Sequence, residues 1–127
     1  MEPLFIDTNW TAVCLGSIVS FLVGYIWYSD YAFGPKWRSG LGLTKSGGGD
    51  MKLGLIAQAF ATFFMAWAIG MTEVYNDLPL AILITLTIIA FTKASGFFAQ
   101  KNRLTISIEV GYIFCMFAIM LLAHAIF

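Results

Sequence analysis

The chain has 127 residues, of which 60% are hydrophobic and only 11% are charged, whereas an average soluble domain is about 45–50% apolar and about 25% charged. So few charged side chains cannot cover a soluble core of this length, which excludes an ordinary soluble fold. Seven basic and seven acidic residues give a net charge of zero, so bulk electrostatics do not favour nucleic acid as a partner.

Four long apolar segments follow one another along the chain. Residues 9–29 and 53–72 carry no charge, and each is about as long as a helix that crosses a hydrocarbon core of about 30 Å. The segment at about 79–100 is interrupted by Lys93, and the segment at about 104–127 contains Glu109. The pattern predicts an all-α integral membrane protein, a four-transmembrane-helix antiparallel bundle that forms a single membrane domain over residues 1–127.

The linker between the first two segments, residues 30–52, differs from them in composition. It contains six of the twelve glycines, and the consecutive Gly47–Gly49 are typical of a flexible tip. Its first half is rich in aromatic rings and basic side chains, which suits a segment at the membrane surface. We therefore expect a cytoplasmic or interfacial linker.

A cluster of aromatic residues marks the start of this linker. Its members, with one glycine among them, are Trp27, Tyr28, Phe33, Gly34 and Trp37. Because amphipathic rings prefer the level of the lipid headgroups, we interpret the cluster as an interfacial belt. A re-entrant lid or a surface that docks a partner is the alternative.

The basic residues predict the orientation of the bundle. All seven lie in the linker or around the end of the third segment, at Lys36, Arg38, Lys45, Lys52, Lys93, Lys101 and Arg103. The N-terminal tail, the turn at 73–77 and the C-terminus contain none. Basic loops stay on the cytoplasmic side, so we expect a multi-pass protein with both termini outside, which in a bacterium means the inner membrane.

Three short motifs resemble a known family. They are Asn9-Trp10 at the start of the first segment, Gly24-Tyr25-Ile26-Trp27-Tyr28-Ser29 at its end, and Phe33-Gly34-Pro35-Lys36-Trp37 in the linker. Together with residues 98–103 and the pair Gly111-Tyr112, they resemble the small four-helix membrane proteins of domain-of-unknown-function family 1761. The resemblance implies the four-helix fold and a membrane location. It implies no activity, because none is established for that family.

Small residues recur every four positions on the first two segments. The rows are Ala12, Gly16, Ser20 and Gly24, and then Gly54, Gln58, Thr62, Ala66 and Gly70. In lipid, helices associate by close backbone approach, so such rows mark packing faces. They indicate packing within the bundle or, alternatively, a homo-oligomer interface.

A polar layer is predicted on the cytoplasmic side. At about 1.5 Å per residue, Lys93 lies about 12 Å inward of Lys101, and Glu109 lies about 9 Å inward of Arg103. Gln58 and Ser20 reach a similar level from the first two segments. The matched depths predict a structural contact between Lys93 and Glu109, or two residues that separately reach the headgroups. Charged residues within a span are also candidates for function, here a substrate, proton or lipid-headgroup site.

The remaining reactive residues do not form a recognisable site. Cys14 and Cys115 lie in apolar runs far apart, and His124 is the only histidine, so we expect neither a metal nor a cofactor. No Ser-His-Asp or paired-carboxylate arrangement occurs within the predicted spans, so we expect no enzyme. Two hypotheses remain. The chain is a structural or accessory membrane protein, homo-oligomeric or bound to other membrane subunits, or it is a small transporter or channel that uses Glu109 and Lys93.

Overall fold

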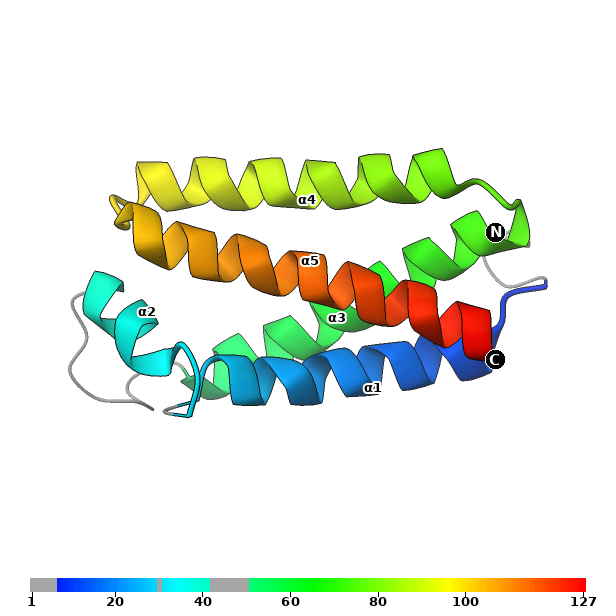
Figure 1. Ribbon diagram of the computed structural model, residues 1–127, viewed down its shortest axis with the longest axis horizontal. Helices are drawn as coiled ribbons and strands as arrows, with labels where there is room; N and C mark the ends of the chain where they lie inside the picture. Colours follow the sequence, from blue (N-terminus) through cyan, green and yellow to red (C-terminus); the bar gives the residue numbers. More distant parts are fainter. Residues whose placement is uncertain (1–6, 30, 42–50) are drawn as a thin grey trace.

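Four long helices and one short helix make up the fold of the residues that the structure describes. The computed structural model of the protein describes residues 7–29, 31–41 and 51–127. The long helices are α1 (Trp10–Trp27), α3 (Met51–Val74), α4 (Leu78–Phe98) and α5 (Arg103–Ile126), and the short helix is α2 (Gly34–Leu41) (Figure 1). All four long helices have the length and apolar composition needed to cross a membrane. The predicted all-α four-helix bundle is confirmed.

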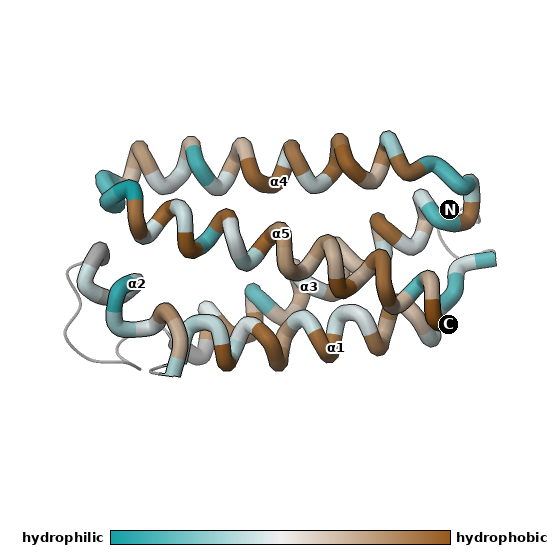
Figure 2. Tube along the Cα trace, viewed as in Figure 1, coloured by the Kyte–Doolittle hydropathy of each residue, from teal (hydrophilic) through white to brown (hydrophobic). Residues whose placement is uncertain are grey.

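The long helices run antiparallel to one another. Both termini lie at one end of the bundle, and α2 and the turn between α4 and α5 lie at the other end (Figure 1). Hydrophilic residues gather at these ends, whereas the helices between them are mostly apolar (Figure 2). Lys36 on α2, Lys101 and Arg103 therefore share the end opposite the termini, which we call the basic end.

The core lies mainly among α1, α3 and α5. Its buried apolar side chains come from all of the long helices and include Val13, Met65, Ile69, Ile89, Tyr112, Ile113, Met116 and Met120. Helix α4 packs against α5 and α3 and is the least buried span, with 22% of its residues buried against 39% for α5. It therefore forms the outer layer of the bundle.

Helix α3 crosses the bundle obliquely, behind α5 in Figure 1. Its second half is inside, where Thr62, Ala66 and Ile69 are almost fully buried. Its first half is open, with Leu53 and Phe60 exposed by 65% and 60%. The bundle is thus closed at the end that carries the termini and less tightly packed at the basic end.

The α3–α4 turn and the α4–α5 turn have the same backbone conformation. Asn76 and Gln100 adopt a positive φ just beyond the ends of α3 and α4, which allows the next N–H to bond back into the finished helix. Asp77 N–H donates to the Thr72 carbonyl at 2.8 Å, and Lys101 N–H donates to the Gly96 carbonyl at 3.0 Å. The side chains of Asp77 and Asn102 then cap α4 and α5. These short turns fix each pair of helices as antiparallel neighbours.

The predicted segments differ from the observed helices by at most two residues at any boundary, which is within the normal ambiguity of helix ends. Helix α2, inside the predicted linker, is the one element that the apolar pattern did not indicate. It is short, its sequence GPKWRSGL is polar on average, and contacts with α5 support it. The predicted flexible tip at Gly47–Gly49 lies outside the described residues.

Candidate functional site

The chain reverses direction between α1 and α2 through a compact turn. Phe33 N–H donates to the Trp27 carbonyl, and Gly34 N–H donates to the Ser29 carbonyl, both at 3.0 Å. A Cβ at Gly34 would collide with the carbonyl groups of Tyr28 and Ser29, so only glycine fits this position. The turn directs α2 back onto the first part of α5.

The aromatic cluster packs on α5 instead of forming only a belt among the headgroups. The rings of Trp27 and Phe33 lie 4.7 Å apart, those of Tyr28 and Trp37 lie 4.8 Å apart, and Tyr28 meets Tyr112 edge-on at 5.6 Å. Trp27 Nε1 donates to the carbonyl of Ile108 at 3.0 Å. The motif therefore joins α1, α2 and α5 into one unit at the basic end.

Two glycines make this docking possible, because each receives a ring from the opposite helix. Trp27 lies over Gly111 of α5, where its Cζ2 would be 3.2 Å from an added Cβ. Tyr112 of α5 lies over Gly24 of α1, and its ring would overlap an added Cβ. The Tyr112 hydroxyl donates to the backbone carbonyl of Ser20. This reciprocal arrangement explains why the two Gly-aromatic motifs of the sequence occur together.

The small-residue rows lie mostly in the interior. Gly16 faces Met120 and Ala123 of α5, and Gly70 faces Val13 of α1 and His124 of α5. Ser20 and Ala66 are fully buried. The predicted packing of Gly54 within the bundle is wrong, because an added Cβ there would meet nothing within 4 Å among the described residues. Gly54 belongs to the first half of α3, which is open. A place for Gly54 in a homo-oligomer interface stays a prediction.

Ser20 and Gln58, two members of the predicted polar layer, lie near Tyr112. The Gln58 amide donates to Thr62 Oγ1 at 3.2 Å and lies beside the Tyr112 hydroxyl. Ser20 Oγ is buried and has no hydrogen-bond partner among the described residues. These groups form a small polar region inside an otherwise apolar core.

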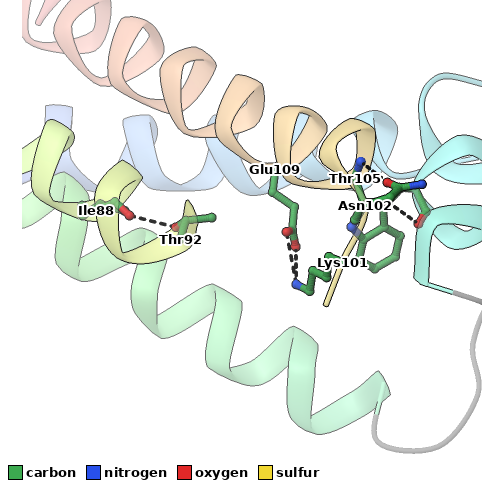
Figure 3. A network of polar contacts seen from close by, with 7 residues as sticks. Ile88, Thr92, Lys101, Asn102, Thr105 and Glu109 are labelled. Atoms are coloured by element: carbon green, nitrogen blue, oxygen red, sulfur yellow. Dashed lines mark hydrogen bonds and ion pairs between the residues drawn. The ribbon is translucent and has the colours of Figure 1, made fainter. Parts of the chain in front are cut away.

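The predicted contact between Lys93 and Glu109 is wrong. Glu109 binds Lys101 instead, with Lys101 Nζ 3.1 Å from Oε1 and 2.9 Å from Oε2 (Figure 3). Thr92, one position before Lys93, faces the groove beside Glu109, and Lys93 lies about 100° further round the helix, where it is exposed. The turn at Gln100 brings Lys101 back beneath α5, so its side chain reaches Glu109.

An open pocket contains this ion pair. Its volume is about 390 Å³, and it is lined by Thr87, Ile88, Phe91, Thr92 and Ser95 of α4 together with Lys101 and Glu109. Sequence reasoning identified Glu109 but missed the other lining residues. Positions 88, 91, 92 and 95 share one helix face by their spacing, yet nothing in the sequence distinguished that face from the others on α4.

The Tyr28 hydroxyl stays protonated beside this site. Burial raises the pKa of Tyr28 well above its usual value of 10.0, and the neighbouring Glu109 carboxylate raises it further. A negative charge on Tyr28 would be both desolvated and repelled. Tyr28 is therefore a neutral member of the aromatic cluster over the ordinary pH range.

At the end that carries the termini, His124 is partly buried against Gly70, and its Nδ1 lies 2.9 Å from the Met120 carbonyl. A carbonyl oxygen only accepts, so Nδ1 is the donor. Within residues 7–29, 31–41 and 51–127, no three His, Cys, Asp or Glu side chains lie together as a metal site would require.

The chain is a multi-pass α-helical membrane protein. It has four apolar spans joined by capped turns, and small residues are buried between the helices. The chain belongs to the family described as protein of unknown function (DUF1761), whose model matches residues 11–125. No curated protein and no solved structure matches the chain.

Proposed function

We propose that the protein is a structural or accessory membrane subunit without enzymatic activity that works as a homo-oligomer or within a larger membrane assembly. The observation that carries the proposal is the position of α4. This span packs on α5 and α3 but leaves most of its surface outside the bundle. Its outward side chains include Leu83 and Leu86, which are exposed by 59% and 50%. A second copy packed against this face would cover it.

The alternative, a small transporter or channel, has less support. A coupling carboxylate has to be free to exchange its partner, whereas both oxygens of Glu109 are bonded to Lys101. Four closely packed helices also largely fill their own interior, and Tyr112 occupies the space between α1 and α5 over Gly24. A transport pathway would therefore have to form between subunits.

The proposal includes the orientation, with the basic end in the cytoplasm and both termini outside, as in the inner membrane of a bacterium. Single cysteines at Ser39 on α2 and at Tyr75 in the α3–α4 turn test it, because both positions are exposed. In a Cys14→Ala, Cys115→Ala background, an impermeant thiol reagent added outside should label Tyr75→Cys but not Ser39→Cys. The reverse pattern would invert the orientation.

Cross-linking in native membranes tests the assembly. In the same cysteine-free background, Leu86→Cys places a thiol on the outer face of α4. Leu22→Cys places one on α1 at a similar exposure, 58% against 50%. Oxidation should link Leu86→Cys into dimers and leave Leu22→Cys monomeric, and native mass spectrometry should give multiples of 14.0 kDa. A lone 14.0 kDa species with neither variant cross-linked would refute self-assembly through α4.

A further inference from the structure

The pocket between α4 and α5 changes in polarity with depth. At about 1.5 Å per residue, Ser95 lies about 4 Å from the end of α4 at Phe98, Thr92 about 9 Å, and Ile88 about 15 Å. Glu109 lies about 9 Å from the start of α5, level with Thr92. The two charged residues and Ser95 therefore lie within about 9 Å of the helix ends. Phe91 is about level with Thr92, and deeper in the pocket lie Ile88 and Thr87, whose hydroxyl donates to the Leu83 carbonyl of its own helix. A lipid has the same order of polarity.

The ion pair retains unused bonding capacity. The Lys101 ammonium has three N–H donors, and Glu109 takes two of them. A carboxylate accepts at about four positions, and Lys101 fills two. The two side chains are only 26% and 16% exposed, so a ligand charge that meets them is screened less by water than at an open surface. The pocket thus offers one positive and one negative group side by side.

The pocket is open and not enclosed. Its described lining comes from α4, α5 and the turn between them, without a residue of α3. The first half of α3 leads away from the core, and Phe60 on it is 60% exposed. Figure 3 shows Glu109 of α5 and Lys101 pointing toward one another. A ligand can therefore enter sideways from the bilayer and keep its acyl chains there.

From these observations we infer that the pocket binds the headgroup of a phospholipid that carries phosphoethanolamine. Its phosphate meets the free N–H of Lys101 and the hydroxyl of Ser95, and its ammonium donates to Glu109. The upper part of the acyl chains lies against Ile88 and Phe91. The volume of about 390 Å³ is within the range of about 300–1,000 Å³ that small-molecule sites occupy.

The ion pair makes the site selective for this headgroup. Choline carries the same charge but has no N–H, so it cannot donate to Glu109. Phosphatidylglycerol brings a net negative charge, which Lys101 attracts but Glu109 repels. Only a zwitterion with N–H donors satisfies both members of the pair. This inference does not depend on the proposed subunit role, because a monomer contains the whole pocket.

Native mass spectrometry of the delipidated protein tests the inference. The probes are phosphatidylethanolamine, phosphatidylcholine and phosphatidylglycerol with identical acyl chains, each added at the same concentration. The wild type should bind the ethanolamine lipid about tenfold more tightly than the other two. Equal binding of all three would overturn the inference. So would equally tight binding of water-soluble phosphoethanolamine, because the acyl chains would then contribute nothing.

Variants locate the site and test its chemistry. Ser95→Leu fills the pocket and should abolish the preference, whereas Ala94→Leu, exposed and next to it on α4 but outside the lining, should keep it. Glu109→Gln removes the negative charge that attracts the ammonium and leaves Lys101 unneutralised, so the preference should change toward phosphatidylglycerol. Loss of selectivity in both leucine variants would place the lipid elsewhere. This leucine pair decides the question even if Glu109→Gln does not fold.

Discussion

The contact between Gly24 and Tyr112 allows a quantitative test of the packing between α1 and α5. In Gly24→Ala the new methyl group would overlap the Tyr112 hydroxyl and lie only 2.6 Å from Cζ. Tyr112 is 3% exposed, so its ring has to move within a packed core, which costs about 1–3 kcal/mol. Loss of its hydrogen bond to Ser20 costs about 0.5–1.5 kcal/mol. The better helix propensity of alanine offsets about 0.5–1 kcal/mol of this destabilisation. The net expected destabilisation is about 2 kcal/mol.

Reversible unfolding in mixed micelles of a mild detergent and sodium dodecyl sulfate measures this free energy. Gly54→Ala is the matched control, because its methyl group meets nothing within 4 Å in the part of the chain that the structure describes. It should be neutral or stabilising by up to about 1 kcal/mol. Adding Tyr112→Phe to Gly24→Ala removes the closest clashing atom and should recover part of the loss. If Gly24→Ala were as stable as Gly54→Ala, α1 and α5 would not pack as described.

Two further predictions concern the basic end. Lys101→Met and Glu109→Gln should each destabilise the protein by about 1.5–3 kcal/mol, since Lys101→Met removes the donor and Glu109→Gln removes the negative charge of the pair. The double variant should lose less stability than the sum of the two single losses, and additive losses would contradict the ion pair. As a control, Lys93→Met at an exposed position should change stability by less than about 0.5 kcal/mol. The raised pKa of Tyr28 means that the folded state keeps this proton to a higher pH than the unfolded state, whose tyrosine titrates near 10.0. The free energy of unfolding should therefore fall as the pH rises above about 10, and pH titrations of stability should show a smaller fall for Tyr28→Phe.

The sequence was sufficient for the fold because one physical constraint dominates it. Each span has to satisfy its own backbone hydrogen bonds in lipid, so uninterrupted apolar stretches of sufficient length can only be helices. The ends of these stretches also mark the ends of the helices. At two of these ends, Asp77 and Asn102 are the cap residues of α4 and α5. Helix α2 was not predicted because contacts with α5 stabilise it. Such contacts produce no recognisable pattern in the sequence of a short polar segment.

The site was harder to predict because it depends on how the helices cross. Depth along a helix follows from counting residues, and it placed Lys93 and Glu109 at similar levels. Depth does not give the direction of a side chain around the helix, and Lys93 points outward while Lys101 reaches back through the turn at Gln100. Likewise, Gly54 fits the small-residue row, but the oblique path of α3 leaves it without a neighbour within 4 Å among residues 7–29, 31–41 and 51–127.

The reciprocal seating of Trp27 on Gly111 and of Tyr112 on Gly24 also has a consequence for biosynthesis. It joins α1 to α5, so the ribosome has to synthesise most of α5 before either ring finds its glycine. Until then, the Gly24 face of α1 is unfilled, and α1 packs against α3. A nascent chain that stops before α5 leaves that face, and the aromatic residues beside it, open to membrane quality-control proteases. The face of α1 around Gly24 therefore closes only after α5 has been synthesised.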